Sequence, residues 1–237
     1  MGTVGESRCG QGWGACHDAP TMLELFALNV LSGAAYIFVP VYFERILNPD
    51  FSPEPLAVRF NGSFNLLMYT TVLFACAPLR VHLTTRRRVA EFCIGVCGGI
   101  TLFPLISSTE PTSLATTSGW TPQSYWIYSA CGAASLAIIA YATWRSASRW
   151  MMLLKLGLIG AYLIAALAVT TSHNAGTPTQ LASVHLHHYF IAWLIAALLT
   201  ADDALVRVGA GAAYAVFIQG ASVYGFASII ELGPAAT

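Results

Sequence analysis

The sequence predicts an all-α fold, a polytopic membrane bundle of about seven transmembrane helices. Of the 237 residues, 56% are hydrophobic and only 9% are charged, whereas soluble domains carry roughly 25% charged residues. The charged residues cluster between long apolar runs, as expected where lipid replaces water around the chain. A net charge of zero provides no basic field for nucleic acid. The hydrophobic composition makes the lipid bilayer the expected partner.

Seven segments approach the roughly 20 apolar residues that a transmembrane helix needs. They cover residues 21–47, 62–83, 89–108, 124–145, 150–171, 183–202 and 204–231. Pro78 and Pro104 interrupt the second and third segments, and neighbouring helices in a bundle can satisfy the backbone groups that a kink frees. We therefore expect a short polar N-terminal tail, residues 1–20, followed by a single transmembrane domain, residues 21–237.

The Lys and Arg residues predict an orientation, because cytoplasmic loops are rich in them. Strict alternation of the seven segments puts nine of the eleven on one side and leaves Arg45 and Arg59 on the other. The nine are Arg8, Arg80, Arg86, Arg87, Arg88, Arg145, Arg149, Lys155 and Arg207. We therefore expect the N-terminus inside and the C-terminus outside, in a membrane that the sequence does not identify.

A histidine cluster at the start of segment 183–202 is the main candidate site. His185 and His188 are three residues apart and share a face of a helix, whereas His187 points elsewhere. Neutral imidazole is the commonest metal ligand, and a zinc site needs three or four donors. The sequence therefore raises the hypothesis of a divalent metal such as zinc at this mouth of the bundle.

The predicted topology brings further donors to the same mouth. They are His173, Glu44 at the end of the first segment, and Glu231 at the end of the last. Two other interpretations stay open beside the metal site. The histidines can cap a helix N-terminus at the membrane surface, or they can sense protons or contact a ligand, since imidazole titrates near pH 6.5. The metalloprotease motif H-E-x-x-H does not occur in the chain.

The acidic residues in or beside the spans lie near the ends that we expect inside. These residues are Glu24, Glu91, Asp202 and Asp203. An acid within a membrane span is by default a functional hypothesis, but here the nearby arginines favour structural ion pairs. The middle of the spans holds no acid and no lysine, which argues against a proton pump and leaves little polar path for a transporter or channel.

Other residues in the spans are interpreted as packing residues. The deeper polar residues, which interhelical hydrogen bonds explain, are Asn29, Asn65, Gln219, Ser222 and Tyr224. The glycines that predict a close-packing last helix are Gly209, Gly211, Gly220 and Gly225. The cysteines expected to be small buried packing residues are Cys76, Cys93, Cys97 and Cys131.

The C-terminal quarter contains the runs V-H-L-H-H-Y-F-I-A-W-L-I-A-A-L-L-T and A-V-F-I-Q-G-A-S-V-Y-G-F-A-S-I, within residues 184–229. These runs resemble the C-terminal multi-pass membrane region of eukaryotic LCCL-domain-containing membrane proteins. The matching positions are His185, His187, His188, Tyr189, Phe217, Gly220, Gly225, Phe226 and Ser228. The LCCL domain itself has no counterpart in this sequence. The resemblance implies a helical membrane bundle and no established reaction.

The favoured interpretation is a non-catalytic integral membrane protein. It would be an accessory or structural subunit of a membrane complex, or a scaffold-like bundle with a histidine-rich polar mouth, and other membrane-protein subunits would be its partners. The alternative is a metal-dependent, membrane-embedded enzyme that uses the histidine cluster. A transporter or channel comes third, because so few polar groups lie deep in the spans.

Overall fold

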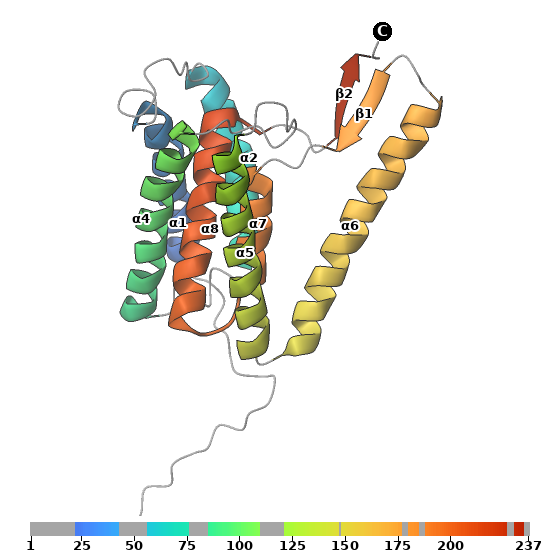
Figure 1. Cartoon of the computed structure of the whole chain (residues 1–237). Coiled ribbons are helices and arrows are strands. Elements are labelled where there is room, and N and C mark those ends of the chain that lie inside the picture. The colour runs from blue at the N-terminus through green and yellow to red at the C-terminus, as the bar shows by residue number, and fades with distance from the viewer. Residues whose placement is uncertain are drawn as a thin grey trace, which may run out of the picture.

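The computed structural model describes residues 22–42, 56–75, 85–109, 121–146, 148–176, 180–184, 188–226 and 230–234. This part of the chain forms seven helices and two short strands (Figure 1). The helices are α1 (Met22–Tyr42), α2 (Leu56–Ala75), α4 (Arg86–Thr109), α5 (Pro122–Arg145), α6 (Arg149–Gly176), α7 (His188–Leu198) and α8 (Ala204–Tyr224). The strands are β1 (Gln180–Val184) and β2 (Ile230–Pro234). The predicted helical bundle is confirmed for the described residues, with a small ribbon added to it.

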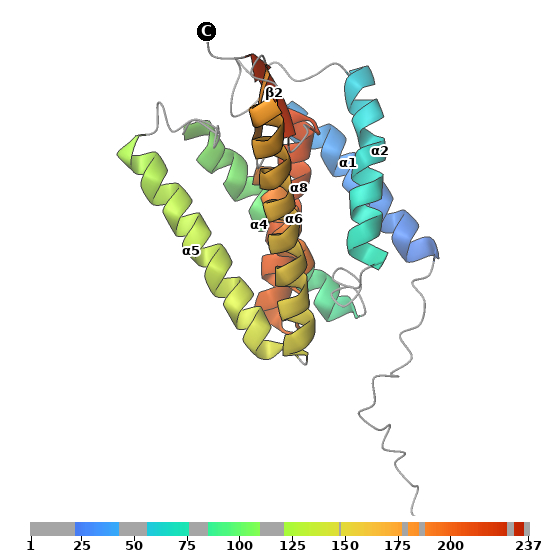
Figure 2. The same cartoon turned by 90° about the vertical axis from the view of Figure 1, so that its right-hand side faces the viewer.

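Helix α8 is the central element of the bundle, and it packs mainly against α4, α7 and α1 (Figures 1 and 2). In its most apolar stretch of 18 residues, 61% of the residues are buried. Val206, Tyr214, Phe217 and Ile218 of α8 are all almost completely buried. The hydrophobic core therefore runs along α8.

Glycines let α4 and α8 approach until their backbones touch. A Cβ on Gly95 would lie 2.0 Å from the carbonyl oxygen of Val208, and one on Gly211 would lie 2.1 Å from the carbonyl oxygen of Phe92. A Cβ on Gly99 would meet the α8 backbone at 2.7 Å. Gly95 and Gly99 form a G-x-x-x-G pattern, the spacing that brings membrane helices into close contact. The close packing expected of α8 is confirmed at Gly211, and α4 supplies the matching surface.

The described helices alternate in direction along the chain (Figures 1 and 2). Helices α1, α4, α6 and α8 begin at one end of the bundle, and α2, α5 and α7 finish there. We call it the arginine end, because six arginines lie in the first or last turns of helices there: Arg86, Arg87, Arg88, Arg145, Arg149 and Arg207. The other end, which carries β1 and β2, is called the ribbon end.

Helices α5 and α6 lie at the side of the bundle, and α6 stands apart from the other helices in Figure 1. Only 6% of the most apolar stretch of α5 and 11% of that of α6 are buried. Ile138 of α5 packs beside Gly209 of α8, and Lys155 Nζ of α6 donates a hydrogen bond to the Ala197 carbonyl of α7 at 3.3 Å. Nevertheless α5, α6 and α8 are the three described helices long and apolar enough to cross a membrane.

The strands β1 and β2 form an antiparallel ribbon in which Ser183 pairs with Glu231 and Val184 pairs with Ile230. This ribbon corrects the predicted segment 183–202, because Ser183 and Val184 belong to β1 and the described helix begins at His188. At 1.5 Å per residue, the 11 residues of α7 extend roughly 17 Å, against a hydrocarbon core of about 30 Å. A single apolar run in the sequence thus contains two different structures.

The last predicted segment, 204–231, is also too long. Helix α8 ends at Tyr224, and Gly225 follows with a φ of 72°. L side chains rarely adopt that conformation, so glycine is the residue that allows the chain to leave the helix here. The end of the segment belongs to β2 instead.

Candidate functional site

The predicted histidine mouth falls partly outside the described residues, which do not include His185, His187 or Glu44. His173 lies in the last turn of α6 and is half-buried. His188 is the first residue of α7, and Glu231 lies on β2, where the structure gives their backbone positions.

The ribbon register nevertheless places the predicted ligand segments at one end of the bundle. Glu231 pairs with Ser183, two residues before His185, and β1 packs against α6, whose last turn carries His173. Among the described residues, no three His, Cys, Asp or Glu residues gather closely enough to hold a metal ion. The metal site therefore stays a prediction, supported by the backbone arrangement alone.

A network of ion pairs occupies the arginine end. Arg207 of α8 donates from Nε to Glu91 of α4 at 2.6 Å, and its Nη1 pairs with Asp202 in the turn between α7 and α8. Arg88 also binds Asp202, and Arg87 donates to Glu91 at 2.9 Å. The Arg207 side chain is only 9% exposed, and that of Glu91 is 14% exposed, so the pair at the centre of the network is shielded from solvent. The network fixes the start of α4 to the start of α8.

A second pair extends the network to α5. Arg145 Nε lies 3.6 Å from Asp203 Oδ2, and the Tyr141 hydroxyl donates to the same oxygen at 3.2 Å. The other Asp203 oxygen accepts the backbone N–H of Leu205 at 2.9 Å, which caps the N-terminus of α8. The prediction that the inner acids pair with arginines is confirmed for Glu91 and for both aspartates; the Glu24 side chain lies outside the described part.

A cluster of hydroxyl groups lies in the core. The Tyr214 hydroxyl of α8 is hydrogen-bonded to Ser32 Oγ of α1 and lies 3.3 Å from Thr70 Oγ1 of α2. Ser32 also donates to the carbonyl of Leu28 in its own helix at 2.7 Å. Sequence reasoning passed over this cluster because Ser and Thr in a span commonly bond to their own helix. Three hydroxyls from three helices thus satisfy one another where water is excluded.

The amide of Gln219 is an exception in this core. The residue is completely buried, and neither its Oε1 nor its Nε2 has a hydrogen-bond partner among the described residues. Ser222 Oγ donates to the Gln219 carbonyl within α8, at 2.9 Å. The predicted interhelical hydrogen bonds are therefore wrong for Gln219 and for Ser222. Asn65 is exposed, and the Tyr224 side chain lies outside the described part.

An aromatic cluster joins α2, α7 and α8 near the ribbon end. The Phe226 ring stacks on Tyr69, with centroids 5.5 Å apart and an angle of 3° between the planes. Its edge contacts are to Tyr189 at 5.8 Å and to Phe217 at 6.3 Å. Gly225 makes the turn that brings Phe226 back onto this cluster. Four positions of the LCCL resemblance thus serve in packing here, which gives a structural reason for those residue types without testing the resemblance.

The cysteines give a different result. Cys93 and Cys97 of α4 and Cys131 of α5 are free and exposed, so the expectation that they are buried is wrong. Cys93 and Cys97 lie one helical turn apart, on a face of α4 different from the glycine face that contacts α8. Cys76 lies outside the described residues.

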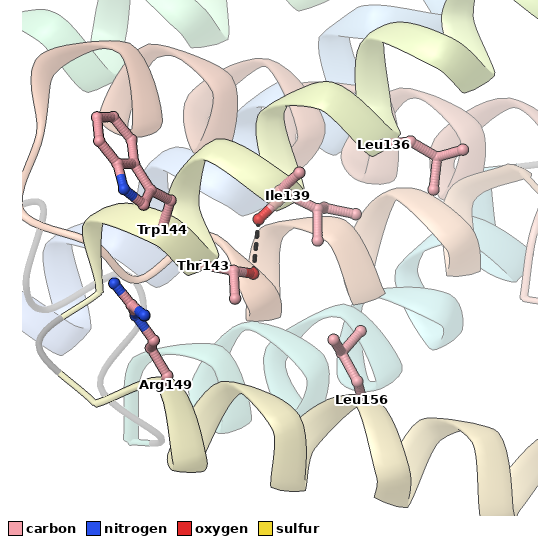
Figure 3. Close-up of a pocket in the computed structure, with 7 residues that line it drawn as sticks. Leu136, Ile139, Thr143, Trp144, Arg149 and Leu156 are labelled. Atoms are coloured by element: carbon pink, nitrogen blue, oxygen red, sulfur yellow. Dashed lines mark hydrogen bonds between the residues drawn. The ribbon is translucent and has the colours of Figure 1, made fainter.

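A pocket of about 560 Å³ opens between α5 and α6 (Figure 3). Its lining is mostly apolar, with the polar groups gathered toward the arginine end. The residues that line it are Leu136, Ile139, Ala140, Thr143, Trp144, Arg149 and Leu156. The Thr143 hydroxyl donates to the Ile139 carbonyl of its own helix at 2.8 Å, so this hydroxyl is already satisfied.

The described sites differ in what they can do. The ion pairs, the hydroxyl cluster and the aromatic cluster hold helices together, whereas the pocket between α5 and α6 is open to a small molecule or a lipid.

Comparison of the chain with models of known families, with curated proteins and with solved structures finds no match.

Proposed function

We propose that this protein is a multi-pass membrane protein, with the arginine end in the cytoplasm. The observation that carries the proposal is the alternation in direction of all seven described helices, which puts the arginines of distant segments at one end. Positively charged loops remain on the cytoplasmic side of membrane proteins, so this end is assigned inside. The described helices α5, α6 and α8 meet the length and composition needed to span.

Cysteine labelling in sealed vesicles tests this topology. The six native cysteines are replaced by serine, and a single cysteine is returned at Thr85, beside the arginine end, or at Gln123, in the first turn of α5. Both positions are exposed. We expect a membrane-impermeant maleimide to reach the two positions from opposite sides, with Thr85→Cys on the cytoplasmic side. Labelling of both positions from one side would contradict the spanning arrangement, and exchanged sides would contradict the orientation.

We further propose that the protein acts as a non-catalytic subunit or scaffold within a membrane complex. Its carboxylates with described side chains, Glu91, Asp202 and Asp203, are all engaged with arginines that join helices. Helices α5 and α6 present long apolar faces that the rest of the described chain leaves uncovered. Such faces suit contact with lipid or with the helices of another membrane protein.

The mass of the native assembly tests the subunit proposal. A chain of 25.3 kDa, purified from its own membrane in a mild detergent, is measured by native mass spectrometry. We expect a mass that includes at least one other protein. A chain that is always found alone, at its own mass, would overturn the subunit role while leaving the topology intact.

A metal-dependent enzyme is the second candidate, and the ribbon register favours it. Glu231 on β2 pairs beside the segment that leads into His185, at the end of the bundle that also holds His173. Elemental analysis for zinc, iron and copper is compared between the natural protein and a variant with His185→Ala and His188→Ala. Stoichiometric metal that the double variant loses would favour the enzyme, and metal-free natural protein would exclude this site.

A further inference from the structure

We infer that the pocket between α5 and α6 binds one anionic glycerophospholipid, with its phosphate at Arg149 and an acyl chain along the apolar wall. The inference rests on the membrane topology proposed above. It adds a specific ligand that neither the bundle nor the subunit role requires.

The charge of Arg149 is the first reason. Within the described residues, each of Arg87, Arg88, Arg145 and Arg207 pairs with a carboxylate, whereas Arg149 has no hydrogen bond or ion pair. Arg149 extends from the first turn of α6 toward the last turns of α5, at the mouth of the pocket (Figure 3). An uncompensated guanidinium there suits a phosphate, which it can bind through two parallel hydrogen bonds.

The position of Trp144 is the second reason. It lines the pocket beside Arg149, it is 65% exposed, and it lies one residue before the end of α5. Trp is enriched at the level of lipid headgroups, where its ring faces the acyl region and its N–H faces the polar layer. Trp144 and Arg149 therefore mark the same membrane depth, and the pocket extends from that depth into the bilayer.

The length of the pocket suits an acyl chain of one leaflet. From Trp144 to Leu136 the wall extends about 12 Å at 1.5 Å per residue, close to the roughly 15 Å of one leaflet's hydrocarbon. The pocket holds about 560 Å³, which is within the usual range of small-molecule sites.

Leu156 and Ala140 define the apolar wall on the two sides of the pocket, on α6 and α5. Figure 3 shows Leu156 projecting from α6 into the gap that faces α5. Among the described residues no carboxylate lines the pocket, so none of them repels an anionic headgroup there. In the described part of the chain, an unpaired cation at the mouth and an uncharged wall fit an anionic lipid better than a zwitterionic one.

The test uses the full chain in nanodiscs of phosphatidylcholine that contain a minor fraction of phosphatidylglycerol. Native mass spectrometry counts the lipids that stay bound after release from the disc. We expect one retained phosphatidylglycerol for the natural chain, and roughly fivefold less retention for Arg149→Gln, the effect of about one basic side chain near the membrane surface. Arg86→Gln is the matched control, because Arg86 is also exposed at the arginine end and has no ion-pair partner among the described residues. It should leave retention unchanged.

A second variant, Ala140→Phe, fills the apolar wall and should reduce retention of phosphatidylglycerol while leaving Arg149 in place. Inorganic phosphate at millimolar concentration should not displace the lipid, because the acyl chain supplies part of the binding. Equal losses for Arg149→Gln and Arg86→Gln, full retention in Ala140→Phe, or displacement by phosphate would each overturn the inference. Failure of the chain to insert, seen in the labelling of Gln123→Cys, would instead refute the proposed topology.

Discussion

Helices α6 and α8 have opposite surroundings. Both are long and apolar enough to span a membrane, yet 61% of the α8 stretch is buried against only 11% of the α6 stretch. The α8 surface is rich in Gly and Ala, which permit backbone contact, whereas α6 carries Leu, Met and Trp side chains that point outward. Hydropathy reports the solvent that a helix prefers, and side-chain size reports whether another helix can approach. Since lipid is as apolar as leucine, the small side chains of α8 explain why other helices can pack closely against it.

The largest expected effect comes from a single methyl group between α4 and α8. In Gly95→Ala the new Cβ would lie 2.0 Å from the Val208 carbonyl oxygen, so the two backbones must separate. We expect a loss of about 3 kcal/mol in the free energy of unfolding, at the upper end for overpacked cores, because backbone cannot rotate out of the way. The measurement is thermal unfolding of the detergent-solubilised protein.

Gly98→Ala is the matched control for this substitution. Gly98 lies three residues from Gly95 in the same helix, and a Cβ there would meet nothing within 4 Å. Alanine is the better helix former by roughly 0.5–1 kcal/mol, so this variant should unfold at the same temperature or slightly higher. Equal destabilisation by both substitutions would show that the seam between α4 and α8 is not the tight contact described here.

The ion-pair network should give the next largest effect. In Arg207→Met, Glu91 and Asp202 lose their shared cation in a place where the Arg207 side chain is 9% exposed. We expect the midpoint of thermal unfolding to fall by roughly 5 °C. Arg87→Gln is the comparison, because Arg87 also pairs with Glu91 but its side chain is 85% exposed, and it should change the midpoint by about 1 °C or less. A midpoint that responds equally to both variants would argue against a shielded pair.

How far the sequence predicts this molecule depends on the kind of interaction. The helices were predictable, because the length of an apolar run indicates a span. The ion pairs were predictable as well, because Glu91 and Asp203 lie near span ends where arginines cluster. The strand before His188 was not, because a short apolar run has the same composition in a strand as in a buried helix. The close contact between α4 and α8 has a sequence pattern, Gly95-x-x-x-Gly99. The surface of α8 that meets this pattern depends on tertiary contact, which the sequence does not give. The histidine site stays a prediction for the same reason.

Gln219 is a buried polar residue of α8, and its substitution tests how the core along that helix is stabilised. Its amide is fully buried and has no hydrogen-bond partner in the part of the chain that the structure describes, so Gln219→Leu replaces a desolvated polar group with a side chain of similar size. We expect the protein to gain about 1–2 kcal/mol in the free energy of unfolding. Gln219→Glu, which keeps the shape and adds a charge, should instead destabilise it strongly. A loss of stability in Gln219→Leu would mean that a bound water or ligand satisfies the amide in the membrane.

The smallest expected effect is for an exposed leucine of α6, the helix at the side of the bundle. Leu158 is 63% exposed, so Leu158→Ala removes a side chain that contacts lipid rather than protein, and its effect should stay within about 0.5 kcal/mol. Leu199, beside the start of α8, is 0% exposed, and the same change there should cost about 3 kcal/mol because it leaves a cavity. Unfolding of both variants in the same detergent gives the comparison. The two variants are also compared in the native assembly and in the separated chain. If Leu158→Ala were as costly as Leu199→Ala in the assembly but neutral in the separated chain, a partner subunit rather than lipid would cover α6.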